Sequence, residues 1–383
     1  MFTRIHRGLR VVTAIALVAM FAGAASAQDA DRIRIFGSLN AGYGKVDNIP
    51  VQGLTKKGTT DYRVLSLQFR FTLSETDQFV TQLVSRKVGE SVINEANPAI
   101  YPVWAYYQHR FNSGAVVKIG RTPLPRGIYN EVRYIGTLLP FYRVGESVYA
   151  ETLENLDGAS IAKSWSAGAW GLEATGFAGG FDLHALLPGS DGKVSLVSAR
   201  LEKAVGTQLW VNTPLKGVRI GEFAARMEES TEGTNYPYLS VVHSIDGNWA
   251  HAFVKAEMTE FRSRMKSERD ASYYRGYYAL AGVKPTEKFT ISAGREGVVR
   301  RLDFPAPISP AFVNLDATKE WIGGISYAAS SNVTFKFEAH AREGYLWDVA
   351  VPIVKPPTKP PLSMTVLPPS KGNFAIASVA ITF

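Results

Sequence analysis

Apolar and polar residues alternate one by one along much of the chain. In residues 64–71, leucine and phenylalanine occupy the odd positions, while Ser66, Gln68 and Arg70 occupy the even positions. Residues 333–342 show the same pattern. Alternation of this kind puts apolar side chains on one face of a strand and polar side chains on the other, so it predicts an all-β fold. It does not by itself distinguish a membrane barrel from a soluble sandwich, which alternates in the same way.

The lengths of the connections between these segments separate the two folds. Long connections follow odd-numbered strands, and short ones follow most even-numbered strands. Short turns at one end and long loops at the other are typical of a transmembrane antiparallel β-barrel of the outer membrane. The predicted long connections are 44–61, 87–101, 122–157, 178–193, 298–318 and 344–372. The sixteen predicted strands are 32–43, 62–73, 77–86, 102–111, 115–121, 158–165, 168–177, 194–204, 217–228, 236–245, 249–261, 273–284, 288–297, 319–328, 332–343 and 373–383.

The segment 206–215 is ambiguous, because residues 208–211 fit either another strand or a structured turn. We predict a turn, since a seventeenth strand would break the even count that places both ends of a barrel on the periplasmic side. The sheet must close, because an open edge in hydrocarbon leaves backbone groups unpaired. A barrel of about sixteen strands is too wide for side chains to fill, so an aqueous channel remains unless something plugs it.

The N-terminus has the three parts of a secretory signal peptide. Arg4, Arg7 and Arg10 form a basic head, residues 11–24 are mostly apolar, and residues 25–27 read Ala-Ser-Ala. The apolar stretch is too short to span a membrane as a helix, and the small residues suit cleavage. We predict a signal peptide over residues 1–27 and a single barrel domain over residues 28–383.

Composition and charge narrow the function further. The 383 residues are 46% hydrophobic and 20% charged with no cysteine, which argues against disorder and against a disulfide scaffold. The net charge is +8, from 42 basic and 34 acidic residues, and loss of the three signal-peptide arginines leaves +5. So mild a positive charge gives no support for nucleic-acid binding and permits a preference for anions.

The last predicted strand ends the chain at an aromatic residue, Phe383. In this the sequence resembles bacterial outer-membrane barrels, whose terminal strand and final phenylalanine are read by the barrel-assembly machinery. The resemblance implies an assembly signal at Phe383 and a location in the outer membrane as a multi-pass barrel.

The longest predicted connection, 122–157, is too apolar for a loop in free water. Ile128, Leu138, Leu139 and Phe141 would all need burial, which suggests a segment packed inside the barrel against its wall. Residues 120–133 follow the pattern G-R-x-x-L-P-x-G-x-Y-N-E-x-R.

This segment resembles the third loop of Gram-negative porins with sixteen strands, in particular the phosphate-selective-porin-like relatives. In those porins the third loop folds into the lumen and forms the constriction. The acidic loop motif usual in general enterobacterial porins is missing here, so their cation preference is not carried over. The resemblance also implies a homotrimer.

The charges on this loop are the candidate pore constriction. Opposite charges facing a narrow aqueous gap create a field that selects solutes by charge and size. Arginine suits the role because it stays ionised when crowded. The candidates are Arg126, Arg133 and Arg143 on the positive side and Glu131 and Glu146 on the negative side.

Arginines at polar positions of the predicted strands are the candidate pore wall. For each of them, and for the loop arginines, the alternative role is a salt bridge between loop and wall or a contact with lipopolysaccharide at the rim. The wall candidates are Arg70, Arg110, Arg121 and Arg200, with Lys336 and Arg342 further round the barrel.

The remaining chemistry argues against a metalloenzyme. The five histidines after residue 27 show no HxxH or HExxH spacing, and no Walker, G-x-S-x-G or dinucleotide motif occurs. His243 and Ser244 are adjacent on one predicted strand and so point to opposite faces, which rules them out as a base and nucleophile pair. We predict no enzyme, no metal and no cofactor.

The sequence thus predicts a sixteen-stranded outer-membrane porin for passive diffusion of small hydrophilic solutes, with a modest anion preference. Its expected partners are outer-membrane lipid and lipopolysaccharide, small solutes that are mostly anions, the assembly machinery and two further copies of itself. One alternative is a channel specific for phosphate, sulfate or a carboxylate. A second is a surface or adhesin barrel that does not conduct.

Overall fold

The structure is a computed structural model. It describes residues 32–96, 99–143, 145–149, 153–188, 193–231, 234–264, 270–303, 312–349, 351, 354–355 and 365–383. The predicted signal peptide, residues 1–27, lies outside the described residues. Within the described part of the chain, no helix has the length and apolar character needed to cross a membrane.

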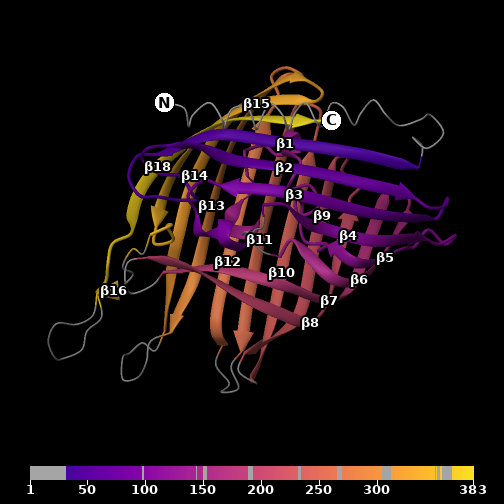
Figure 1. Cartoon of the computed structure of the whole chain (residues 1–383), viewed down its shortest axis with the longest axis horizontal. Helices are drawn as coiled ribbons and strands as arrows, with labels where there is room; N and C mark the ends of the chain where they lie inside the picture. Colours follow the sequence, from indigo (N-terminus) through magenta and orange to yellow (C-terminus); the bar gives the residue numbers. More distant parts are fainter. Residues whose placement is uncertain are drawn as a thin grey trace.

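Sixteen antiparallel strands form one closed barrel, which confirms the predicted fold class (Figure 1). Each strand pairs with its neighbour in the chain, and the indigo β1 lies beside the yellow β18 to close the ring. The barrel strands are β1 Ile33–Val46, β2 Thr59–Thr72, β3 Asp77–Val88, β4 Tyr101–Arg110, β5 Val116–Pro123, β6 Asn155–Ala167, β7 Trp170–Pro188, β8 Val194–Asn212, β9 Val218–Thr231, β10 Thr234–Asn248, β11 Ala252–Arg264, β12 Asp270–Val283, β13 Phe289–Asp303, β14 Phe312–Ser330, β15 Val333–Gly344 and β18 Ser370–Thr382.

The other elements are small and lie in the connections. β16 Val354–Lys355 and β17 Thr365–Val366 form a separate two-stranded sheet. The short helices are η1 Val92–Ala96, η2 Gly136–Leu138 and α2 Glu146–Tyr149. Two of the three helices therefore belong to the third long connection, residues 124–154, which we call loop 3.

Three boundary predictions are wrong. Residues 208–211 are not a turn but the end of β8, where alternation continues with Gln208 and Trp210 buried and Leu209 exposed. Residues 178–193 are not a long connection, because β7 runs on to Pro188 and β8 starts at Val194. The connection 298–318 is also shorter than predicted, because β13 runs on to Asp303 and β14 starts at Phe312. The even strand count survives because these segments lengthen existing strands.

The seam between β1 and β18 joins the two ends of the barrel sequence. The Gly37 N–H donates to the Phe383 carbonyl at 2.7 Å, and the Phe383 N–H donates to the Gly37 carbonyl at 3.0 Å. The Phe383 ring lies over the Gly37 Cα, where an added Cβ would come within 2.1 Å of a ring carbon. Glycine at this position therefore leaves the space in which the Phe383 ring packs on the neighbouring strand.

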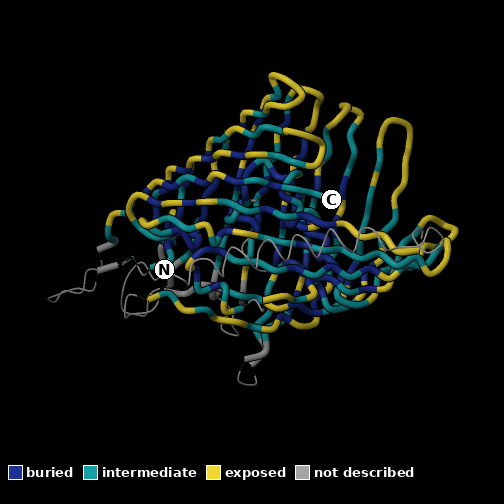
Figure 2. The backbone as a smooth tube through the Cα atoms, turned by 45° about the horizontal axis from the view of Figure 1, so that its top comes forward, coloured by how far each residue is buried: buried dark blue, intermediate teal, exposed yellow. Residues whose placement is uncertain are grey.

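Polar residues line the inside of the barrel and large apolar residues cover much of its outside, so burial alternates along the strands (Figure 2). Buried polar residues on the strands include Asn40, Ser66, Gln82, Ser160, Gln208, Ser244, Glu257, Ser292, Glu296, Glu320, Lys336 and Glu338. Exposed apolar residues on the strands include Ile35, Phe79, Ile119, Ile161, Leu172, Ile220, Leu239, Ile245, Ile291, Trp321, Ile325, Phe335 and Phe337. This is the reverse of a soluble protein, in which the polar face meets the solvent.

Strand length varies around the wall. β5 has 8 residues and β4 has 10, whereas β7, β8 and β14 have 19 each. The two strands that come directly before loop 3 in the chain are therefore short, and three of the strands after it are long.

Candidate functional site

Loop 3 bonds to strands on opposite sides of the barrel. Glu154, near its end, accepts a hydrogen bond from Arg86 on β3 at 3.0 Å. Tyr149, five residues earlier, donates its hydroxyl proton to Glu257 on β11. β3 and β11 lie eight places apart in the closed order of sixteen strands. Tyr149 and Glu154, five residues apart in the chain, therefore bond to strands on opposite sides of the closed ring.

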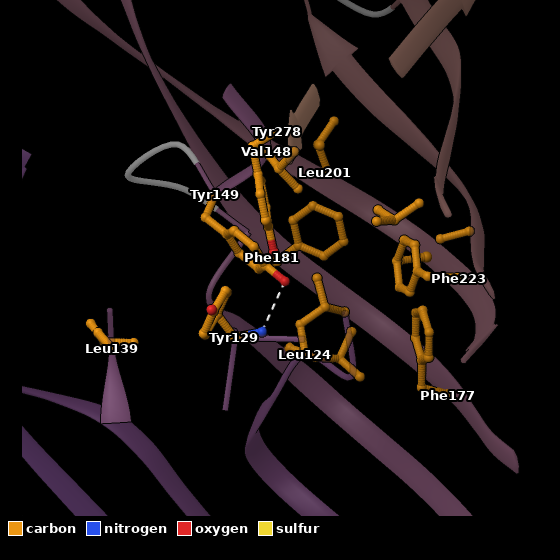
Figure 3. Packing of buried hydrophobic residues seen from close by; sticks show 14 of the residues in the cluster. Leu124, Tyr129, Leu139, Val148, Tyr149, Phe177, Phe181, Leu201, Phe223 and Tyr278 are labelled. Atoms are coloured by element: carbon orange, nitrogen blue, oxygen red, sulfur yellow. Dashed lines mark hydrogen bonds between the residues drawn. The ribbon is translucent and has the colours of Figure 1, made fainter. Parts of the chain in front are cut away.

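One attachment of loop 3 is a buried carboxylate with four donors. Glu257 accepts hydrogen bonds from Ser244 at 2.6 Å, from Tyr278 at 2.5 Å and from the Ile128 N–H at 2.9 Å, besides that from Tyr149. Figure 3 shows the Tyr149 and Tyr278 rings close together, with a dashed line for the 2.9 Å bond from the Tyr129 N–H to the Tyr149 oxygen. Both halves of loop 3 therefore meet at one acidic side chain of the wall.

A lysine holds the middle of loop 3 from another strand. The Lys336 ammonium on β15 donates to the carbonyl oxygens of Gly136, Leu139 and Phe141, at 2.5, 2.6 and 3.0 Å. Its neighbour on the same face, Glu338, accepts a hydrogen bond from the Tyr142 N–H at 2.7 Å. The polar face of β15 therefore binds loop 3 through its backbone.

Helix α2 rests directly on β12. Ser147 donates its hydroxyl proton to the Tyr277 carbonyl at 2.8 Å, and the Ser147 carbonyl accepts from the Tyr274 hydroxyl at 2.7 Å. Gly276 makes this approach possible, because a Cβ there would lie 1.7 Å from the Ser147 oxygen.

Charge pairing fixes the end of loop 3. Glu154 is buried between Arg86, at 3.0 Å, and Arg133, at 3.5 Å, and it accepts a hydrogen bond from the Tyr134 hydroxyl. Burial alone would raise the pKa of Glu154, but the two guanidinium groups and the phenol more than offset burial and lower it. Glu154 is therefore held as a carboxylate.

The apolar residues of loop 3 behave as predicted with one exception. Leu139 and Phe141 are each 4% exposed, and Ile128 packs against the same cluster of wall residues. Leu138 is 58% exposed, so the prediction of its burial is wrong. It lies in the single turn of η2, where Leu138 and Leu139 point in different directions and only Leu139 reaches the cluster.

The predicted loop arginines are all engaged by the protein. Arg126 is buried and donates to the Val148 carbonyl at 2.8 Å and to Thr259 at 2.9 Å. Arg133 donates to the Tyr149 carbonyl at 3.0 Å, in addition to its ion pair with Glu154. Arg143 donates to the Tyr62 hydroxyl at 3.3 Å. These guanidinium groups are fixed in place, and each still lines an open space described below.

The two predicted loop acids differ in position. Glu146 accepts hydrogen bonds from Gln52 at 2.6 Å and from Arg342 at 3.4 Å. Glu131 is exposed and lines neither of the two spaces described next. The structure therefore brings Glu146, but not Glu131, together with the loop arginines.

Two spaces adjoin loop 3 in the barrel. A small gap of about 40 Å³ lies between loop 3 and the β2–β3 wall and is lined by Asn40, Tyr62, Arg86, Arg133, Tyr142 and Arg143, among others. A large cavity of about 580 Å³ lies toward the end of the barrel that carries the long connections. Its charged lining residues are Arg126, Arg143, Arg300, Arg301 and Arg342 against Glu146, Glu296 and Asp348.

The predicted wall residues divide by face. Arg70 lies on the face of β2 that carries the buried Tyr62 and Ser66, and Arg110 lies on the face of β4 that carries the buried Tyr106. Lys336 and Arg342 are buried on the inner face of β15. These four side chains share the inward face, and Arg110 is exposed at the short-turn end.

Arg121 and Arg200 differ from the pore-wall prediction, because the structure places them on the outer face. Arg121 comes two residues after the exposed Ile119 and so lies on the same, outer face. Arg200 comes directly before the fully buried Leu201 and so lies on the opposite face. Both pair with Asp157, at 2.7 and 2.9 Å, and Arg200 also pairs with Asp182 at 3.1 Å. For Arg200, a bulge at residues 202–204 of β8 reverses the alternation, and a bulge cannot be read from residue type alone. Arg121 follows the regular alternation of β5, in which it shares the outer face with Ile119.

Several residues of the site were not singled out from the sequence. Arg86 and Glu257 bond to loop 3, Arg300 lines the large cavity, and Glu154 is part of loop 3 itself. The signal was present for those on strands, since each is a charged residue at an inward position of an alternating segment. Glu154 had none, because it lies outside the strands and its partners are distant in sequence.

Comparison with known proteins adds the following. No protein-family model matches the chain, and no curated protein sequence matches it. Solved structures do match: OmpF of Salmonella typhi in complex with daunomycin, with a TM-score of 0.56 and 9% identity, covers 92% of this chain and 97% of that chain. The trimer form of in-vitro folded OmpT from Vibrio cholerae matches with a TM-score of 0.55 and 10% identity, and the match covers 92% of this chain and 99% of that chain.

An anion-selective porin from Comamonas acidovorans gives a TM-score of 0.53 at 9% identity, over 92% of this chain and 99% of that chain. The fold is that of the outer-membrane porins. Such low identities establish the shared sixteen-stranded barrel and leave solute, selectivity and assembly to be argued from this chain's own residues.

Proposed function

We propose that this chain is an outer-membrane porin through which small hydrophilic solutes diffuse passively, with a modest preference for anions. The observation that carries the proposal is the reversed polarity of a closed barrel, which is apolar outside and polar inside. A closed ring satisfies its backbone hydrogen bonds in hydrocarbon, and a polar interior provides a path for water. We propose a channel and not an enzyme.

Loop 3 narrows this path in the proposal. Its bonds to β3 and β11, and to Lys336 on β15, support a position inside the lumen. The small gap beside the β2–β3 wall, with the stacked Tyr62 and Tyr142 rings on it, is then the constriction. Passage through a gap of this size favours ions and small polar molecules.

Fixed positive charge supports the anion preference. Arg86, Arg133 and Arg143 line the small gap. Five arginines and three acidic residues line the large cavity. Arginine remains ionised in such surroundings, so both spaces favour negatively charged solutes. The match to an anion-selective porin points in the same direction.

A homotrimer embedded in outer-membrane lipid and lipopolysaccharide completes the proposal. It rests on the trimer form of the matched OmpT and on the predicted signal peptide and terminal Phe383. The assembly machinery would read the terminal strand before the barrel closes at Gly37.

The test is single-channel recording of the refolded protein in a planar bilayer under a KCl gradient. Heat-dependent migration on SDS gels verifies that each preparation is folded. We expect ohmic steps and a reversal potential of the sign for chloride selectivity. Silence of folded protein would overturn the channel and favour a non-conducting surface barrel, and a potential of the opposite sign would overturn the anion preference.

A second candidate is a channel specific for an inorganic anion such as phosphate. It rests on the loop pattern at residues 120–133, and the comparisons do not single out the phosphate-selective branch. Saturation of the current with rising phosphate, and block of chloride current by phosphate, would favour it over simple diffusion.

A further inference from the structure

The large cavity has an arrangement of side chains that simple diffusion does not require. Phe261 on β11 is the register partner of Tyr274 on β12, and Tyr274 is the register partner of Arg300 on β13. Register partners on one face have Cβ atoms about 5 Å apart. Two aromatic rings and a guanidinium group therefore stand in a row across three strands, and all three line the cavity.

A third ring extends this row. Tyr238 on β10 packs against Phe261 with ring centroids 5.0 Å apart, and it also lines the cavity. All three rings are half-buried, so each keeps part of its surface open. Tyr274 is anchored by its hydroxyl to the Ser147 carbonyl of loop 3 at 2.7 Å.

The guanidinium at the other end of the row is available for a ligand. Arg300 is half-buried on the inward face of β13 and forms no hydrogen bond or ion pair with any residue in the described ranges. The nearest acid on its own face of β13, Glu296, lies four residues earlier in the chain and accepts hydrogen bonds from Ser147. Around the cavity, five arginines outnumber three acids.

The two ends of the row differ in polarity, and this difference sets the orientation of a bound anion. At the Tyr238 end, the Tyr238 hydroxyl already donates to Glu229 at 2.5 Å, so its proton is engaged by the protein. At the Arg300 end, the charge attracts one. A flat aromatic ring with a carboxylate at one edge satisfies both ends, since the ring stacks on aromatic faces and the carboxylate takes a two-pronged bond from the guanidinium.

We propose that this cavity is a binding site for aromatic carboxylates on the way to the constriction. The proposal rests on the proposed channel function and names a preferred solute class for it. The ring lies against Phe261 and Tyr274, and the carboxylate lies on Arg300.

The test compares benzoate with cyclohexanecarboxylate, which has the same charge and a similar size but no aromatic face. Benzamide supplies the ring without the charge. Binding to the refolded full chain in detergent is measured by calorimetry, and block of chloride current is measured in bilayers. We expect benzoate to bind about fivefold more tightly than cyclohexanecarboxylate because of the stacked rings. Benzamide should bind more weakly than benzoate.

The variants separate the two ends of the row. Arg300→Gln should weaken benzoate binding about tenfold through loss of the charged bond. Phe261→Leu should remove the advantage of benzoate over cyclohexanecarboxylate. The matched control is Arg295→Gln on the same strand, whose side chain lies on the outer face over Trp321 and should leave binding unchanged.

Failure of this inference and failure of the channel give different results. Equal binding of benzoate and cyclohexanecarboxylate, or benzoate binding that is unchanged in Arg300→Gln, would overturn the aromatic site even if the protein conducts. Selective benzoate binding by a protein that passes no current would instead uphold the site and overturn the channel.

Discussion

At the scale of single residues, the Tyr62 and Tyr142 pair closes loop 3 onto the β2 wall. Their rings stack with centroids 4.5 Å apart and planes 24° from parallel. Both are buried, and Arg143 donates to the Tyr62 hydroxyl beside them. The pair forms one side of the small gap and limits its width.

Removing one ring should widen the gap. We expect Tyr142→Ala to raise the single-channel conductance about twofold, since the constriction dominates the resistance of a pore. The control is Tyr107→Ala, because Tyr107 is exposed on the outer face of β4. Equal conductance of wild type and Tyr142→Ala would show that the ions take another route.

The three bonds of Lys336 give a second prediction at this scale. Lys336→Met leaves three carbonyl oxygens of loop 3 without their donor, at roughly 1–3 kcal/mol for each buried group. We expect noisier current and faster proteolysis within residues 124–154, while the barrel keeps its SDS resistance. Lys163→Met, on the same face as the exposed Ile161, is the control. Unchanged noise and cleavage would mean that the other bonds between loop 3 and the wall are enough to fix it.

At the scale of elements, the attachment of the end of loop 3 to β3 depends on the charge of Glu154. Its pKa is lowered in the fold from an ordinary value of 4.5, so its ion pairs with Arg86 and Arg133 stabilise the fold above that pH. This stabilisation is lost as the pH falls below 4.5 through the lowered pKa. We expect the wild-type conductance to change reversibly in this acid range.

Glu154→Gln is the comparison, because it removes the charge at every pH and keeps the size of the side chain. Its conductance should show a smaller change over the same acid range than that of wild type. Identical acid responses of the two proteins would assign the effect to other carboxyl groups.

How far the sequence predicts these elements depends on the range of the signal. Alternation as in residues 64–71 is local, and it correctly predicts the number of strands and the inward face of Lys336 and Arg342, while several strand ends differ. Loop 3 was located by its apolar residues, which had to be buried somewhere. The face of Arg200 was missed because a bulge in β8 reverses the alternation, whereas the regular alternation of β5 places Arg121 outward. The partners of Glu154 are set by the closed ring.

At the scale of the whole molecule, the barrel closes where β1 pairs with β18, and the Phe383 ring lies on Gly37 at one end of this seam. Gly37→Ala puts a methyl group where the ring lies, within 2.1 Å of a ring carbon. We expect it to lower the free energy of unfolding by about 1–3 kcal/mol, as overpacking does, and to slow the appearance of the folded band on SDS gels. The control is Gly323→Ala on β14, where a Cβ would meet no atom within 4 Å. Equal stability of the two variants would show that the ring moves aside freely.

The unequal strand lengths have a consequence for the surrounding lipid. β5 has 8 residues, so at about 3.3 Å per residue and a tilt of about 40° its ladder is roughly 20 Å high, less than an apolar band of about 25 Å. In a bilayer, the acyl chains beside β5 must therefore compress, at a fraction of a kcal/mol per Å. In the proposed homotrimer, copies that turn their low sides toward one another would share a single compressed patch, so the elastic energy of the membrane would favour their association.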